Sequence, residues 1–392
     1  MQRSVELGLV LSCARAALDT TEAAAIRQTL TRTVNWERVL SLCLRHGLLP
    51  LVWRTLRPFP DLVPAAAQVA FARAHVVIAA RGASLTQELG RLLRLLEGAG
   101  VEALAYKGPA LAVQLYGDVQ ARAFLDLDLL VRPRDFGRCR ALLIGNGYAP
   151  MHDGAKPTPT AVSRRSECDE SFVHADKRIL VELHWAATPP YFSFPLSTEA
   201  LFERRVRVEV PELSALAPCP EDLLLLLAVN GTKDTWARLE TIVALAALVR
   251  RHPQLAWAAA LDRAAELNAR RMVHVGLLLA RQLLGTIVPD EVMRGADSDH
   301  AAAALAEDAI LRLDREDDGG PMGFVPRSLF ILRSRERLND RVRFCALRAL
   351  TPTRLDAAAL PLPDPLWPVY YLVRPWRLLR QQVTRPIADP RR

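Results

Sequence analysis

Two aspartates stand one residue apart in a run that is otherwise apolar, FLDLDLLV, which spans Phe124 to Val131. A short apolar run of this kind predicts a buried strand. Alternate residues of a strand share a face, so Asp126 and Asp128 point to the same side. Ionised carboxylates avoid apolar surroundings unless their charge is compensated. Two carboxylates about 7 Å apart along a strand therefore predict a divalent cation, and oxygen ligands suit Mg²⁺ or Mn²⁺.

The alternative for the two aspartates is a set of salt bridges, in which Arg122 and Arg132 neutralise them. Arg122 stands just before the acidic strand, where its guanidinium can contact a phosphate or hold a carboxylate. We favour metal binding, because residues before and after the strand point to the same chemistry.

The residues before the acidic strand predict a phosphate-binding turn. Lys107 and Gly108 stand between a predicted strand, Val101 to Tyr106, and a predicted helix, Pro109 to Tyr116. The first turn of a helix offers free backbone N–H groups and partial positive charge to an anion. Gly108 lets a phosphate approach the main chain, and Lys107 adds a positive charge. An ordinary surface lysine is the competing interpretation of Lys107.

A third acidic residue, Glu182, lies in the apolar run Ile179 to Trp185, which predicts one strand of a hairpin. Two-metal sites for phosphoryl transfer usually need such a further carboxylate. His184 shares the face of Glu182 on a strand. It can position a phosphate, act as an acid or base, or hydrogen-bond Glu182. A buried histidine without such a role fits the pattern equally well.

The order of predicted elements favours an α+β fold, in which a small mixed sheet is flanked by helical domains. We expect an N-terminal helical region over 1–98, the sheet core over 99–210, a helical domain over 211–300, and a C-terminal region over 301–392 that packs on the helical domain. The further predicted elements are helices at Glu37–Leu49, Ala65–Gly98, Pro133–Gly145, Glu221–Asn230, Trp236–Arg251, Trp257–Leu267 and Arg270–Leu284, and a hairpin of Glu170–His174 with Ile179–Trp185.

Composition indicates a soluble, intracellular protein. The chain carries 51 Lys and Arg against 43 Asp and Glu, a net charge of +8. This modest excess of positive charge is typical of a solvated surface. The more specific interpretation is that it attracts RNA, nucleotides or anionic lipid weakly. The six cysteines form no CxxC pair or Cys/His cluster, which predicts reduced thiols. No run reaches the roughly 18 uncharged apolar residues of a membrane helix, so we expect a cytoplasmic location.

The C-terminal segment mixes aromatic residues with arginines. It can pack on the helical domain, bind a partner, or lie on an anionic membrane surface, and packing is the commonest outcome. Pro368 and Pro375 argue against one long amphipathic helix here.

The residues singled out above resemble the nucleotidyltransferase superfamily of polymerase-beta-like folds. More specifically, the chain resembles a bacterial family of uncharacterised nucleotidyltransferases whose members often accompany biosynthetic clusters for modified peptides. The resemblance rests on Lys107-Gly108, Tyr116-Gly117, Arg122, Asp126-x-Asp128, Gly147-Tyr148 and Glu182-x-His184-Trp185. The superfamily usually has Gly-Ser in place of Lys107-Gly108 and more often Asp than Glu as the third acid. Asn230-Gly231 and Ala244 replace the family's His-Gly and Asp.

The resemblance implies metal-dependent transfer of a nucleoside monophosphate from ATP or another nucleoside triphosphate to an acceptor, with release of pyrophosphate. Asp126 and Asp128 would hold Mg²⁺ or Mn²⁺, and Glu182 would complete the catalytic site. Lys107 and Gly108 would hold the triphosphate, with Arg122 and His184 as further contacts. The acceptor stays open among a peptide or protein, which is slightly favoured, a small molecule, and RNA. A phosphotransferase that uses the same site, or a catalytically weak protein that binds nucleotide or a partner, are the alternatives.

Overall fold

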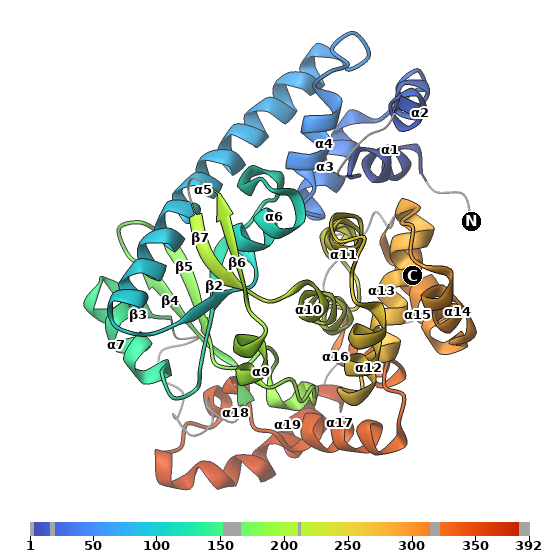
Figure 1. The fold of residues 1–392 in the computed structure, drawn as a ribbon. Helices are drawn as coiled ribbons and strands as arrows, with labels where there is room; N and C mark the ends of the chain where they lie inside the picture. Colours follow the sequence, from blue (N-terminus) through green and yellow to red (C-terminus); the bar gives the residue numbers. More distant parts are fainter. Residues whose placement is uncertain (1–3, 16–19, 152–165, 211–212, 314–321, 384–392) are drawn as a thin grey trace.

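The computed structural model describes residues 4–15, 20–151, 166–210, 213–313 and 322–383. In Figure 1, one long helix, α5 (Ala65–Gly98), runs along the sheet and extends to the N-terminal helices, and further helices pack on the opposite side. The N-terminal helices are α1 (Val5–Cys13), α2 (Thr20–Leu30), α3 (Trp36–Arg45) and α4 (Leu49–Leu56). The predicted class, a mixed sheet with helices around it, is confirmed.

Seven strands form one sheet in the order β3-β4-β5-β2-β1-β7-β6. The pairs β2/β5 and β1/β7 are parallel and the other neighbours are antiparallel, which makes the sheet mixed. The strands are β1 (Ala103–Ala105), β2 (Asp126–Val131), β3 (Tyr148–Pro150), β4 (Asp169–His174), β5 (Ile179–His184), β6 (Val206–Val210) and β7 (Leu213–Ala217).

Helices cover both faces of this sheet. Apolar residues of α5 and of α7 (Phe136–Gly145) form one core with side chains from the strands, among them Leu127 and Leu129 of β2. On the opposite face lies α6 (Gly108–Tyr116), together with the helical part of the chain. The 3₁₀ turn η1 (Val119–Ala121) and α9 (Thr198–Glu203) connect strands, and η2 (Pro190–Phe192) follows β5.

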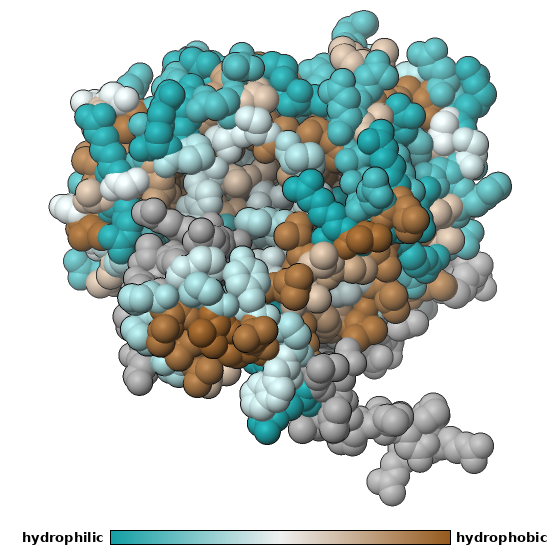
Figure 2. All heavy atoms as spheres, turned by 90° about the horizontal axis from the view of Figure 1, so that it is seen from below, coloured by the Kyte–Doolittle hydropathy of each residue, from teal (hydrophilic) through white to brown (hydrophobic). Residues whose placement is uncertain are grey.

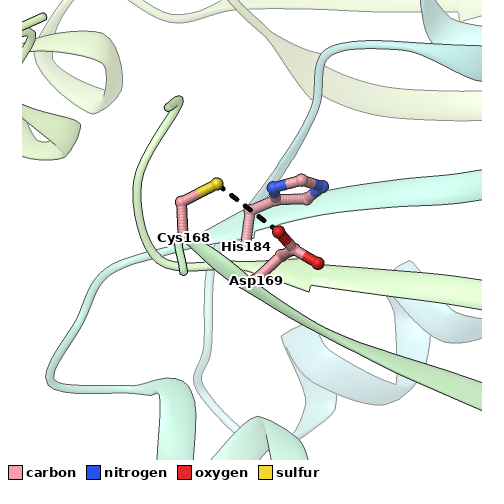
Figure 3. Close-up of side chains that lie close together, drawn as sticks. All are labelled: Cys168, Asp169 and His184. Atoms are coloured by element: carbon pink, nitrogen blue, oxygen red, sulfur yellow. Dashed lines mark hydrogen bonds between the residues drawn. The ribbon is translucent and has the colours of Figure 1, made fainter. Parts of the chain in front are cut away.

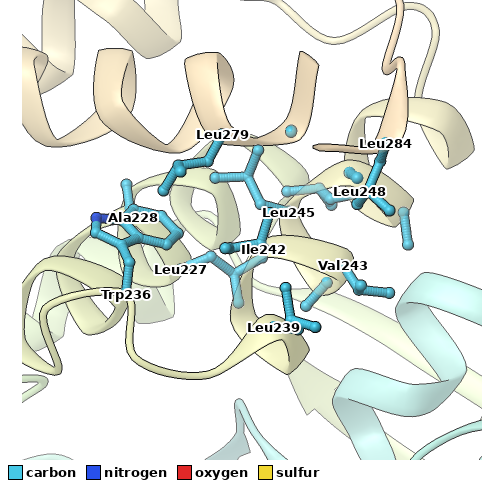
Figure 4. Packing of buried hydrophobic residues seen from close by; sticks show 14 of the residues in the cluster. Leu227, Ala228, Trp236, Leu239, Ile242, Val243, Leu245, Leu248, Leu279 and Leu284 are labelled. Carbon is cyan, nitrogen blue, oxygen red and sulfur yellow. The ribbon is translucent and has the colours of Figure 1, made fainter. Parts of the chain in front are cut away.

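The helices after the sheet pack around buried leucines and Trp236, as Figure 4 shows. They are α10 (Pro220–Lys233), α11 (Leu239–Arg251), α12 (Trp257–Glu266), α13 (Arg270–Leu284), α14 (Asp290–Ser298) and α15 (His300–Leu313). The last elements are α16 (Phe324–Arg333), α17 (Leu338–Leu350), α18 (Arg354–Ala359), η3 (Asp364–Val369) and α19 (Tyr370–Val383). No helix in these described ranges is long and apolar enough to span a membrane.

Several predicted boundaries were wrong for identifiable reasons. The helix predicted over Glu37–Leu49 is divided into α3 and α4, because Gly47 has a φ of 69°. The helix predicted from Trp236 begins at Leu239, since Thr235 and Trp236 also have positive φ. The helix predicted from Pro133 begins at Phe136. In the C-terminal segment, Pro368 lies in η3, whereas α19 continues through Pro375.

Gly231 on α10 provides a test of packing around Trp236. A Cβ atom at Gly231 would lie 2.5 Å from Cζ3 of the Trp236 ring, which is buried. We expect Gly231→Ala to lower the free energy of unfolding by about 1–3 kcal/mol through overpacking. Gly8 on α1 is the control, because no atom other than those of its chain neighbours and its own helix backbone lies within 4 Å of its Cβ position. Urea unfolding that shows equal effects for Gly231→Ala and Gly8→Ala would contradict this packing.

Candidate functional site: an acidic cluster beside a helix N-terminus

The site is built on the two neighbouring parallel strands β2 and β5. Their register places Asp128 directly opposite Glu182, and Asp126 lies one strand period before Asp128 on the same face. Leu127 and Leu129 point into the core on the other face. Pairing of β2 with β5 therefore brings the three acidic residues predicted from sequence onto one face of the sheet.

Asp128 is the most enclosed of the three carboxylates, with 3% of its surface exposed. Its Oδ1 accepts a hydrogen bond from Lys107 Nζ at 2.6 Å, and His184 Nε2 lies 3.0 Å from the same oxygen. Burial raises the pKa of Asp128, but the charge of Lys107 and the contact with His184 outweigh it, so the pKa lies below its usual range. Two side chains of this protein thus hold Asp128 ionised.

His184 is buried between the two opposed carboxylates. Besides its contact with Asp128, its Nε2 lies 3.4 Å from Glu182 Oε2, and the edge of its ring meets the Tyr106 ring with centroids 5.4 Å apart. Burial lowers the pKa of His184, whereas Tyr106, Asp128 and Glu182 raise it, and the result lies well above the usual value. The raised pKa favours the protonated imidazole, whose Nε2 lies between Asp128 and Glu182.

Asp126 lies at the start of β2 and is half-buried. Burial, followed by the charges of Asp128 and Glu182, raises the pKa of its carboxyl group to about 6. Asp126 is outside the close group formed by Asp128, Glu182 and His184, whose ligand atoms all lie within 4.8 Å of one another. The ionised form of Asp126 is thus disfavoured first by burial and then by two neighbouring carboxylates.

Asp126→Asn is expected to stabilise the protein above about pH 6. The folded-state pKa of about 6 exceeds the ordinary value of 3.8, so the folded state binds the proton more tightly. Wild-type stability is therefore lost as the pH rises through this window. The gain in the variant should reach about 1–2 kcal/mol at neutral pH after allowance for screening by water, and vanish below about pH 4. Urea unfolding at both pH values checks this, with Asp262→Asn on α12 as the exposed control.

Lys107 and Gly108 join this acidic face to the N-terminus of α6. Gly108 has a φ of 54°, and a Cβ atom there would lie 3.5 Å from the carbonyl oxygen of Asp126. The first turn of α6 therefore lies beside the start of β2. Pro109 has no N–H group, so the backbone N–H groups of Gly108 and Ala110 are the ones in this turn that an anion can bind. Lys107 occupies the N-cap position, and its bond to Asp128 shows that it is no ordinary surface lysine.

Arg122 is directed elsewhere. Its guanidinium forms an ion pair with Glu240 at the start of α11 and contacts neither aspartate of β2. Arg132 likewise pairs with Glu102 and Glu199. The salt bridges considered in the sequence for the two aspartates are thus not formed with these arginines, and the cations that compensate Asp128 are Lys107 and His184.

Sequence reasoning missed Cys168 and Asp169, which lie beside His184 as Figure 3 shows. The Cys168 thiol donates a hydrogen bond to Asp169 Oδ1 at 3.4 Å, and ligand atoms of these two residues and His184 lie within 4.8 Å of one another. Asp169 and His184 are directly paired across β4 and β5. The predicted hairpin began at Glu170. Extending its register by one residue would have placed Asp169 opposite His184.

The donor atoms fit a hard divalent cation. Carboxylate oxygens of Asp128 and Glu182 face each other, with His184 within the same 4.8 Å group and Asp126 nearby on the same face. Lys107 Nζ already lies 2.6 Å from Asp128, so a cation that binds this oxygen competes with the lysine. A cation that bound this oxygen would therefore have to displace Lys107.

A mixed sheet that carries opposed carboxylates beside a helix N-terminus defines an acidic site suited to metal ions and phosphates. The family model described as uncharacterised nucleotidyltransferase matches residues 32–285, which include every residue of this site. The chain belongs to this family of nucleotidyltransferases.

One solved structure that resembles the chain is an antigenic nucleotidyltransferase-like protein from Paracoccidioides brasiliensis. It is 16% identical, with a TM-score of 0.33, and the similarity covers 54% of this chain and 97% of that protein. No curated protein sequence matches the chain.

Proposed function

We propose that this protein is a metal-dependent nucleotidyltransferase that moves a nucleoside monophosphate from a nucleoside triphosphate to an acceptor and releases pyrophosphate. One observation carries the proposal. Asp128 faces Glu182 across two parallel strands, and the N-terminus of α6 lies beside the start of β2. The family to which the chain belongs supports transfer chemistry of this type.

In this proposal, Asp126, Asp128 and Glu182 hold Mg²⁺ or Mn²⁺. A metal ion held there would supply the positive charge that neutralises the phosphates during in-line attack. The first turn of α6 binds phosphate oxygens through backbone N–H groups, and Gly108 has no Cβ atom that would oppose the close approach of a phosphate. Lys107 moves from Asp128 to the triphosphate, which frees the carboxylate. Glu182 accepts the proton of the acceptor hydroxyl, and His184 fixes the orientation of both carboxylates.

Arg122 has a supporting role in this proposal. Its ion pair with Glu240 connects the segment before β2 to α11 and so fixes the start of the acidic strand. For the acceptor, we favour a peptide or protein over RNA and small molecules, and ATP is the first donor to test. We further propose a cytoplasmic location, which suits a triphosphate donor and the predicted reduced cysteines.

Label transfer tests the proposal. The protein is incubated with Mg²⁺ or Mn²⁺ and with ATP, GTP, CTP or UTP labelled at the α or the γ phosphate, in the presence of host lysate. The lysate is then separated into peptide, protein, RNA and small-molecule fractions. Transfer of α-label that is lost in Asp126→Ala/Asp128→Ala supports nucleotidyl transfer and identifies the acceptor class. Transfer of γ-label alone would replace it by phosphotransferase activity.

A binding protein without turnover is the second candidate, and one observation favours it. Lys107 Nζ and His184 Nε2 both lie within hydrogen-bond distance of Asp128 Oδ1, so side chains of this protein can compensate its charge. If these contacts persist, nucleotide can bind at α6 while the metal ions do not enter. Equilibrium binding of a labelled triphosphate, without transfer of either label at any metal concentration, would favour this candidate over the enzyme.

A further inference from the structure

The outer side of the C-terminal helices exposes apolar side chains in regular stripes. On α17, Leu338, Val342, Cys345 and Ala349 follow one another at helical spacing, so they share one face. Leu338 is 72% exposed and Val342 is 60% exposed, and both other residues are exposed. An apolar helix face normally packs against another element, but Leu338 and Val342 on this face stay largely exposed.

A second stripe follows η3 and α19. Val369, Leu372 and Trp376 are spaced three and four residues apart, with Leu372 76% and Trp376 54% exposed. Figure 2 shows the molecule from below, the side on which Figure 1 places α17 and α19, and large hydrophobic areas lie there. We call the two stripes and the exposed residues beside them the C-terminal apolar surface: Val325, Leu329, Leu338, Val342, Cys345, Ala349, Leu366, Val369, Leu372 and Trp376.

A small groove connects the helices of this surface. Its volume is about 230 Å³, and side chains from α16, α17 and α19 line it, among them Leu329, Ala349 and Leu378. The groove is almost wholly apolar, and Val325 and Cys345 also belong to its lining. The exposed faces of α16 and α17 are therefore one continuous apolar region.

The same part of the chain is strongly basic. Residues 322–383 contain eleven arginines and four acidic residues, so most of the net charge of +8 lies in this stretch. Arg333, Arg337 and Arg343 are exposed, and none of them takes part in an ion pair with any other described residue. The guanidinium of Arg380 lies 4.0 Å from the centre of the Trp376 ring.

This charge decides between possible occupants of the surface. A second copy of the chain would bring a second set of arginines against the first, and their repulsion opposes such a dimer. An anionic partner instead gains from the same charges. Apolar side chains in stripes, an exposed tryptophan and a surplus of arginines are the properties of helices that lie in the headgroup region of a bilayer.

We propose that the C-terminal apolar surface binds an anionic lipid bilayer. The stripes of α17 and α19 enter the boundary between headgroups and acyl chains, and the exposed arginines contact lipid phosphates. Binding is peripheral and reversible. It does not involve Asp128 or Glu182, so it stands whether or not the protein transfers nucleotides.

Vesicle flotation with the full-length protein tests this proposal. Vesicles of phosphatidylcholine alone are compared with vesicles that also contain phosphatidylglycerol, at low and high salt. We expect binding to the anionic vesicles that weakens with salt. Leu338→Ser/Val342→Ser/Leu372→Ser/Trp376→Ser should reduce the partition coefficient at least tenfold, roughly, through lost apolar burial. Arg333→Gln/Arg337→Gln/Arg343→Gln should reduce it about 100-fold at low salt.

Ile287→Ser is the matched control, because Ile287 is highly exposed but lies outside this surface. It should bind vesicles as the wild type does, and circular dichroism should show that every variant is folded. Three outcomes would overturn the proposal. They are failure of the wild type to bind anionic vesicles, binding that survives both sets of substitutions, and a stable dimer or protein complex that the apolar substitutions abolish while lipid binding is absent.

Discussion

Asp128→Asn is expected to reduce the rate of α-label transfer by about 10³-fold or more. The amide keeps the size of the side chain but removes the negative charge that faces Glu182 and that the proposed metal ion needs. It also removes the carboxylate that Lys107 and His184 both contact. The triphosphate could then still bind to Lys107, but without the metal ion that transfer is proposed to need. Single-turnover measurements with labelled triphosphate give the effect on the chemical step.

Asp262→Asn on α12 is the control for this substitution, because its carboxylate is exposed and lies in the helical region. It should transfer label at the wild-type rate. Thermal unfolding of Asp128→Asn separates loss of activity from loss of fold. A folded Asp128→Asn protein with wild-type activity would refute the proposed role of this carboxylate.

The largest effect on stability is expected for Asp356→Ala. Asp356 is fully buried on α18, where its carboxylate accepts a hydrogen bond from Arg377 Nε at 2.5 Å and lies 3.5 Å from Arg374 Nη1. It also accepts the backbone N–H of Thr353 at 2.7 Å in a capping box. Its removal leaves Arg374 buried without its anion, which costs about 3–5 kcal/mol.

Urea unfolding and limited proteolysis measure this loss. Asp356→Ala should be cleaved first between residues 354 and 383, because the ion pairs hold α18 and α19 together. Asp308→Ala removes a half-exposed i,i+4 partner of Arg312 and should cost less than about 0.5 kcal/mol. If both substitutions gave the same small effect, the buried ion pairs would not be what stabilises the C-terminal helices.

Local pattern was sufficient to predict the elements that carry the site. Strand alternation in FLDLDLLV placed both aspartates of β2 on one face, and the Gly at position 108 predicted the turn into α6. Alternation was equally clear in β6, where VRVEV repeats every second residue, but this strand and its partner β7 were not assigned. The alternation alone did not show that β6 and β7 belong to the sheet, because that depends on which strands they lie beside.

The contacts inside the site could not be derived from the sequence, because they depend on pairing between distant strands. The parallel register of β2 and β5 brings Asp128 opposite Glu182, although 54 residues separate them in the chain. The same register lets His184 reach Asp128, whereas sequence spacing suggested Glu182 as its partner. The partner of Arg122 could not be predicted either. Its ion-pair partner Glu240 lies on α11, and no local sequence pattern connects that helix to the segment before β2.

The match to the family model ends before the apolar core of this chain does. The match ends at residue 285, which is the residue after α13. The apolar core does not end there, because buried residues of α14 and α15, among them Val292, Leu305 and Ala309, belong to the same cluster as α10, α11 and α13. Arg335, further on, donates hydrogen bonds to the carbonyl oxygens of Phe192 and Ser193 after β5. A chain shortened to the family match would therefore expose one side of its own core, and we expect it to be less stable than a fragment that continues through α15.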